Sequence, residues 1–216
     1  MKNLNEYLIY TIGERYQEAD KGHDIRHILN VFSFAEKVRS TYFDDKVSKD
    51  MLMTAVFYHD LACKDDRENH HIKGAEILLT DSNLTNWFSK DDIEMMADAV
   101  RNHRASSGKP ETIIAKILYD ADRSEISLER ILERSYQYYI GKGFTNELEI
   151  KENMFNHVSS KYGKYGYAKT VLPESLELLK PSMERTKEVI SNERIFRNMI
   201  DKVVSECKIS VHEKNK

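Results

Sequence analysis

The sequence predicts an all-α protein, and three observations carry that prediction. The chain of 216 residues has only 3 prolines, well below the average usage of about 5%, so few positions break a helix. Apolar residues recur at intervals of three and four in most segments, the spacing that gives a helix one apolar face. Strand signals are nearly absent, because no alternating run ends in an Asn-Gly or Asp-Gly hairpin turn.

Local signals place the individual helices. The helix expected at residues 24–42 carries Ile28 and Phe32 on one apolar stripe. Pro110 suits the first position of a later helix, and Gly141 ends the one after it. Pro181 is a candidate kink in the long C-terminal stretch. In chain order, helices are expected at residues 24–42, 48–60 and 69–80, after a capping box of Ser89 and Asp92, from Pro110, and at residues 127–140, 145–160 and 173–207.

Between two of these helices lies the aromatic and glycine-rich segment Tyr162–Tyr167, YGKYGY. Two interpretations stay open from sequence: a surface connection with partly buried tyrosines, or a mobile flap over a site. The length divided by about 150 residues gives roughly 1.4 domains, which favours a single domain.

Composition excludes several classes of protein. Lys and Arg number 33 against 36 Asp and Glu, a formal net charge of −3, whereas sequence-independent nucleic-acid binding needs a basic surface. Cys63 and Cys207 are too few for a disulfide framework and suit a reducing cytoplasm. There is no apolar run of about 18 residues or more, and Glu6 and Glu14 interrupt the region that a signal peptide keeps apolar. We expect a cytoplasmic protein without membrane or stable nucleic-acid partners.

Several polar residues stand at the edges of apolar helices. His59 and Asp60 end the apolar run MLMTAVFYHD, where burial of both is costly unless something compensates. Asp120 and Asp122 end another apolar helix, and an acidic C-terminal turn opposes the helix dipole. His27 lies beside the first apolar stripe. Each feature alone is more often structural, but a bound cation would explain them together.

Taken in order, His27, His59-Asp60 and Asp122 resemble the H…HD…D pattern of the HD-domain superfamily of metal-dependent phosphohydrolases. The segments HDIRHILNV, YHDLACKDD, NHHIKGAEILL and ILYDADRSE are similar to those of a subgroup of small bacterial HD-domain hydrolases. The resemblance covers about residues 1–140, and Asn30 and residues 124–128 depart from the subgroup. It implies an HD-domain helical bundle of about eight to ten helices. Residues 1–216 would form a single domain, with the motifs at about residues 20–126 and the C-terminal helices completing the bundle.

The resemblance implies one divalent metal ion held by His27, His59, Asp60 and Asp122. Two imidazoles and two carboxylates suit Mn²⁺, Mg²⁺, Fe²⁺, Ni²⁺, Co²⁺ or Zn²⁺. Cys63 is expected to be a buried free thiol and not a ligand. Some members of the superfamily carry extra histidines and two metals. This chain is interpreted as one histidine short of that set, so a single ion is expected.

Further roles follow from positions near the expected ligands. Asp120 is expected to act as a general base or to orient the site from outside the metal ligands, with His103 and Lys64 as further catalytic residues. The residues expected to bind the substrate phosphate are His23, Lys64, His71, His103 and Arg123.

The function that the resemblance implies is hydrolysis of a phosphate ester or anhydride by metal-activated water. The substrate would be a nucleotide or another small phosphorylated metabolite. Two alternatives stay open: a non-catalytic nucleotide-binding or sensor module, and a di-iron oxygenase of the same superfamily. The sequence also leaves open the exact substrate, the metal and the oligomeric state, a homodimer included.

Overall fold

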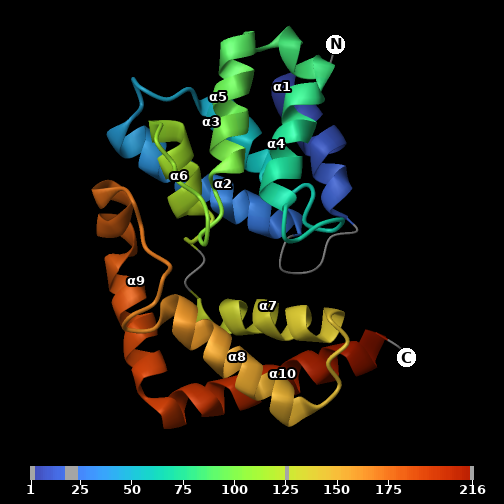
Figure 1. Cartoon of the computed structure of the whole chain (residues 1–216), viewed down its shortest axis with the longest axis vertical. Helices are drawn as coiled ribbons and strands as arrows, with labels where there is room; N and C mark the ends of the chain where they lie inside the picture. The colour runs from blue at the N-terminus through green and yellow to red at the C-terminus, as the bar shows by residue number, and fades with distance from the viewer. Residues whose placement is uncertain (1–2, 18–23, 125–126, 215–216) are drawn as a thin grey trace. The chain divides into compact units, whose positions relative to one another are not determined.

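The structure is a computed structural model that describes residues 3–17, 24–124 and 127–214, with side chains as far as residue 209 (Figure 1). These residues contain ten α-helices and no strand, which confirms the all-α prediction. The α-helices are α1 (Leu4–Tyr7), α2 (Ile25–Tyr42), α3 (Lys49–Tyr58), α4 (His70–Thr80), α5 (Lys90–Arg101), α6 (Ile113–Ala121), α7 (Leu128–Gly141), α8 (Glu147–Tyr162), α9 (Pro173–Ser191) and α10 (Glu193–Lys214). A π-helix, η1 (Leu8–Ile12), and two 3₁₀ helices, η2 (Gly13–Tyr16) and η3 (Ser82–Asn86), complete the set.

The chain forms two compact units. The first comprises residues 1–124 and 170–177 and contains α1 to α6 with the start of α9. In it, α3 packs against α2, α5 and α6, and α5 also packs along α4. Its core consists of fully buried side chains from these helices, among them Ile28, Leu52, Phe57, Leu78, Met96, Ile117 and Leu118.

The second unit comprises residues 125–169 and 178–216. Within it α7 packs against α8, and α10 packs against both. Its separate apolar core includes Leu132, Met154, Val158, Phe196 and Ile200. Each unit therefore buries its own apolar stripes, as the three-four spacing predicts.

One expected helix start is wrong, and a side-chain cap explains it; another cap divides the C-terminal stretch into two helices. Thr112 accepts a hydrogen bond from the Ala115 N–H at 3.3 Å, so α6 begins after Thr112 and Pro110 lies in the preceding segment. Helix α9 continues through Pro181. The C-terminal stretch divides instead at Asn192, whose side chain accepts a bond from the Ile195 N–H at 3.2 Å and so begins α10.

The capping box of Ser89 and Asp92 is confirmed, with both reciprocal hydrogen bonds formed at the start of α5. The segment Tyr162–Tyr167 forms a tight turn after α8, in which the Gly166 N–H donates to the Gly163 carbonyl at 2.8 Å. Tyr165 stands 90% exposed at its tip, and Tyr162 packs against the second core. Among the described residues, no helix is long and apolar enough to cross a membrane.

Candidate metal centre

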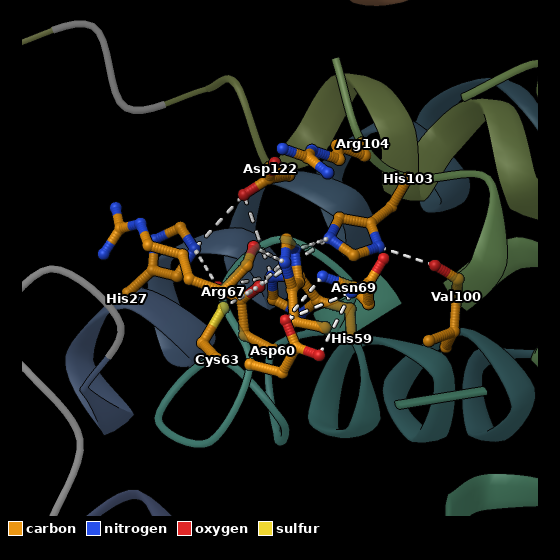
Figure 2. A network of polar contacts seen from close by, with 12 residues as sticks. His27, His59, Asp60, Cys63, Arg67, Asn69, Val100, His103, Arg104 and Asp122 are labelled. Atoms are coloured by element: carbon orange, nitrogen blue, oxygen red, sulfur yellow. Dashed lines mark hydrogen bonds and ion pairs between the residues drawn. The ribbon is translucent and has the colours of Figure 1, made fainter. Parts of the chain in front are cut away.

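The candidate ligands all lie at helix ends of the first unit. His27 is in the first turn of α2, where the Asp24 side chain accepts the His27 N–H at 3.2 Å. His59 caps the C-terminus of α3, and Asp60 follows in the turn. Asp122 caps the C-terminus of α6. Chain segments far apart in sequence therefore deliver one ligand or two each to the same place (Figure 2).

The first donor group consists of His27, His59, Asp60 and Asp122, as the resemblance implies. Their donor atoms all lie within 4.8 Å of one another. His27 Nε2 is 3.4 Å from Asp60 Oδ2 and 3.2 Å from Asp122 Oδ1, and His59 Nε2 is 3.3 Å from Asp60 Oδ2. His27, His59 and Asp60 are buried, whereas the Asp122 side chain keeps 22% of its exposure.

A second donor group lies on the other oxygen of the same aspartate. His70 Nε2 is 3.5 Å and His103 Nε2 is 3.7 Å from Asp60 Oδ1. The two imidazole nitrogens are 3.1 Å apart, and the three residues again offer donor atoms within 4.8 Å of one another. Asp60 thus presents Oδ2 to the first group and Oδ1 to the second.

Backbone carbonyls fix the tautomers of three of these imidazoles. The Nδ1 atoms of His59, His70 and His103 lie 2.6 to 2.8 Å from the carbonyl oxygens of the residues three positions earlier. A carbonyl oxygen only accepts, so each Nδ1 carries a hydrogen, and Nε2 is the ring atom that faces the carboxylates. The buried His59 Nε2 has no hydrogen bond to any described residue.

Two neighbouring contacts shape the position of these groups. The Cys63 thiol donates to Asp60 Oδ1 at 3.2 Å, so this cysteine lies beside the second group as a buried free thiol. Gly74 lets α4 pass close to the end of α3, because a Cβ there would lie 2.9 Å from the Tyr58 carbonyl oxygen and 3.3 Å from that of His59. Gly74 thereby allows His70 to approach Asp60.

The buried charges shift one another's pKa values. Burial lowers the pKa of His59, but Asp60 and Asp122 outweigh burial and raise it to about 10. Burial would raise the pKa of Asp122, yet its polar contacts with His27 and His59 hold that pKa well below its usual range. Burial lowers the pKa of His70 to about 4. Without a cation the first group therefore holds a proton near neutral pH, whereas His70 is neutral.

These observations fit a metal ion. Two lone-pair nitrogens facing each other at 3.1 Å repel unless a proton or cation lies between them. Second-sphere contacts from imidazole Nδ1 to backbone carbonyls are typical of metal-ligating histidines, and they fix the ring so that Nε2 faces the ion. The mixed nitrogen and oxygen donors suit a divalent ion of the Mn²⁺, Fe²⁺ or Zn²⁺ type.

The structure shows structural contacts for Asp120. Its side chain is fully buried, and its two oxygens accept the backbone N–H groups of Val171 at 2.9 Å and Leu172 at 3.0 Å. The carboxylate thus ties the segment before α9 to the end of α6. Both oxygens are engaged there, so the contacts of Asp120 are those of a structural link, and its role as a general base stays a prediction.

Arg123 is also placed differently from the expectation. Its guanidinium is buried, donates to the carbonyl oxygens of Tyr119 and His103, and lies 3.5 Å from the centroid of the Tyr119 ring. It is therefore a packed structural arginine and is not offered to a substrate phosphate.

The other expected substrate contacts are spread around the centre. Lys64 is exposed on the turn after Asp60. His71 is half-buried, with its ring 5.6 Å from that of His70, and lies outside both donor groups. His103 belongs to the second group. His23 lies outside the described residues.

Sequence reasoning missed His70 and selected its neighbour. A signal was present, because His70, Gly74 and Leu78 recur every four residues and all are buried on one face of α4. His70 and His103 both lie beside Asp60, so the second group has two imidazoles.

Comparison with known proteins agrees with this site. Residues 24–126 match the family model for the HD domain, and both donor groups fall within them. This match identifies an HD domain within residues 24–126 of the chain. HD domains bind divalent metals, so the domain and its His/Asp groups indicate a metal-dependent hydrolase.

Two solved structures are similar to this one. A protein of Lactobacillus plantarum is 14% identical, with a TM-score of 0.60 over 95% of this chain and 97% of that chain. A predicted HD superfamily hydrolase from an uncultured Thermotogales bacterium is 22% identical, with a TM-score of 0.49 over 74% of this chain and 94% of that chain. The first of these shows a shared fold. The comparison with curated proteins found no match.

Proposed function

We propose that this HD-domain protein is a phosphohydrolase. It cleaves a phosphate ester or anhydride of a nucleotide or another small phosphorylated metabolite by metal-activated water. The observation that supports the proposal best is the arrangement around Asp60, where imidazole lone pairs from two sides converge on one buried carboxylate. Such an arrangement is costly unless cations occupy it.

In this proposal His27, His59, Asp60 and Asp122 hold a divalent ion. When bound, such an ion lowers the pKa of a coordinated water from about 15.7 toward about 7 and offsets negative charge on phosphoryl oxygens. The partly exposed Asp122 marks the side of the group that solvent and substrate reach.

We propose that His70, His103 and the second oxygen of Asp60 hold another divalent ion. A second ion held beside the first would suit phosphoryl transfer, because it would help to offset the charge on the attacking and leaving oxygens. Lys64 and His71, near these groups in the chain, are our proposed contacts for the outer phosphates of the substrate. Burial lowers the pKa of His71, so it would serve as a neutral hydrogen-bond donor.

The test is a panel of nucleotides and phosphomonoesters incubated with Mg²⁺, Mn²⁺, Co²⁺ or Ni²⁺, with every product identified. We expect orthophosphate or pyrophosphate release that EDTA abolishes and that Asp60→Asn reduces by at least about 10²-fold. The matched control is Asp91→Asn, the same chemical change at an exposed aspartate of α5. Release by Asp60→Asn at the wild-type rate would refute the proposal. Tight nucleotide binding without turnover would favour the sensor module instead.

The second donor group favours one alternative specifically. A di-iron oxygenase needs two metal positions, and Asp60 with His70 and His103 offers the second. Anaerobic loading with Fe²⁺ followed by exposure to oxygen separates the two functions. Oxygen consumption coupled to oxidation of an organic substrate, without phosphate release from any member of the panel, would establish the oxygenase.

A further inference from the structure

Arg123 is the buried charge that the proposed chemistry does not use. Only 5% of the residue is exposed, and no carboxylate of the described residues forms an ion pair with it. Its buried Nε has no hydrogen-bond partner. A guanidinium is costly to bury, so its retention at this place calls for a specific role.

The contacts of Arg123 join two segments of the first unit. One Nη atom donates to the Tyr119 carbonyl oxygen, one turn earlier along α6, and the other donates to the His103 carbonyl oxygen at 3.0 Å. The guanidinium carbon lies 3.5 Å from the centroid of the Tyr119 ring, and the Tyr119 hydroxyl donates to the Ala105 carbonyl oxygen at 3.4 Å. Residues 103–105 are therefore held against the end of α6.

This link connects the two donor groups. Arg123 follows Asp122, a donor of the first group, and it holds the backbone of His103, a donor of the second. The planar guanidinium bonds the two carbonyls from two separate Nη atoms, and the compact ammonium of a lysine does not reproduce that geometry.

We propose that Arg123 is a positioning residue that sets the place of His103 relative to Asp122 and thereby the affinity of the second donor group for its metal ion. The inference rests on the proposed function, since it requires that the centre binds metal. It assigns Arg123 to the assembly of the centre and not to contact with the substrate phosphate.

Loss of the Arg123 charge and loss of its positioning contacts have opposite expected effects on metal affinity, so a substitution distinguishes them. Removal of a nearby positive charge by Arg123→Gln strengthens cation binding if electrostatics alone acts. Loss of the fork weakens binding at the second group if position matters, and Arg123→Lys isolates that effect because it keeps the charge. We expect both variants to bind the second ion about 10–100-fold more weakly, the usual effect of losing an outer contact of a ligand.

The matched control is Arg39→Lys. Arg39 is 7% exposed and donates to the Val47 carbonyl oxygen at 3.3 Å, but it also pairs with Glu36. It lies twelve residues beyond His27 on α2, about 18 Å at 1.5 Å per residue. This variant should lose stability and keep both ions.

The experiment titrates Mn²⁺ into each folded protein, with stoichiometry by calorimetry and coupling between paired Mn²⁺ ions by electron paramagnetic resonance. If Arg123→Lys does not fold, Tyr119→Leu removes the supporting ring and takes its place. The inference is supported if Arg123→Lys weakens binding of the second ion alone and Arg39→Lys leaves that binding unchanged. The inference is overturned if Arg123→Lys binds the second ion as tightly as wild type does, or if Arg39→Lys weakens that binding equally. It is also overturned if the wild-type protein binds only one ion. A wild type that binds no ion instead refutes the proposed function.

Discussion

Substitution of Asp120 by asparagine tests the division between structural and catalytic carboxylates at the end of α6. The asparagine keeps one oxygen acceptor but turns an NH₂ group toward the other backbone N–H, either that of Val171 or that of Leu172. One charge-assisted hydrogen bond, worth about 1.5–3 kcal/mol, is lost, and a buried donor is left without a partner.

Burial raises the pKa of Asp120, which shows that desolvation already offsets part of that gain. We therefore expect Asp120→Asn to lower the free energy of unfolding by about 2 kcal/mol, near the low end of that range. This loss lowers the melting temperature of a chain of this size by about 4–8 °C. The Mn²⁺ content should stay unchanged, because neither oxygen of Asp120 belongs to a donor group.

The assay is thermal unfolding followed by circular dichroism, together with metal content after dialysis against Mn²⁺. Asp91→Asn is the control, since an exposed aspartate changed in the same way should alter stability by no more than about 0.5 kcal/mol. A melting temperature equal to wild type, combined with a large loss of rate or metal, would refute the structural role and restore Asp120 as a catalytic group.

Three further results follow from the same geometry. Gly74→Ala should destabilise the protein by about 1–3 kcal/mol and weaken the second ion, because the new Cβ meets the Tyr58 carbonyl oxygen; unchanged melting temperature and Mn²⁺ titration would contradict this. Between about pH 6 and 8, binding of the first ion should tighten about tenfold per pH unit, because the ion displaces the proton that His59, with its raised pKa, keeps in this range. Calorimetry in two buffers of different ionisation enthalpy should detect that proton, and its absence would disprove the assignment. EDTA should abolish activity but leave the helical circular dichroism nearly unchanged, since each unit buries an apolar core that extends beyond the donors; global unfolding would identify the ion as structural.

The features that local pattern determines were predictable from sequence. Apolar spacing located the helices, because each unit buries one stripe of each helix. The resemblance of His27, His59-Asp60 and Asp122 to the family pattern identified residues that the structure brings together, although each of them alone also allows a structural role. These are local properties, and a single sequence carries them.

The roles that depend on distant partners were not predictable. The two backbone N–H groups that donate to Asp120 lie 51 and 52 residues away, at Val171 and Leu172, and nothing in the local sequence marks them. The choice between His70 and His71 depends on how α4 approaches α3 at Gly74. In each case the local residues allow both roles and tertiary packing selects one.

The metal content of wild type and Asp60→Asn at the same free Mn²⁺ concentration tests the central claim most directly. Asp60 is the residue common to both donor groups, one oxygen facing each. After dialysis and elemental analysis, the account predicts two Mn²⁺ ions per wild-type chain and loss of both in a folded Asp60→Asn protein. Wild-type metal content in Asp60→Asn would contradict it, because a metal centre then could not depend on the carboxylate that both groups share.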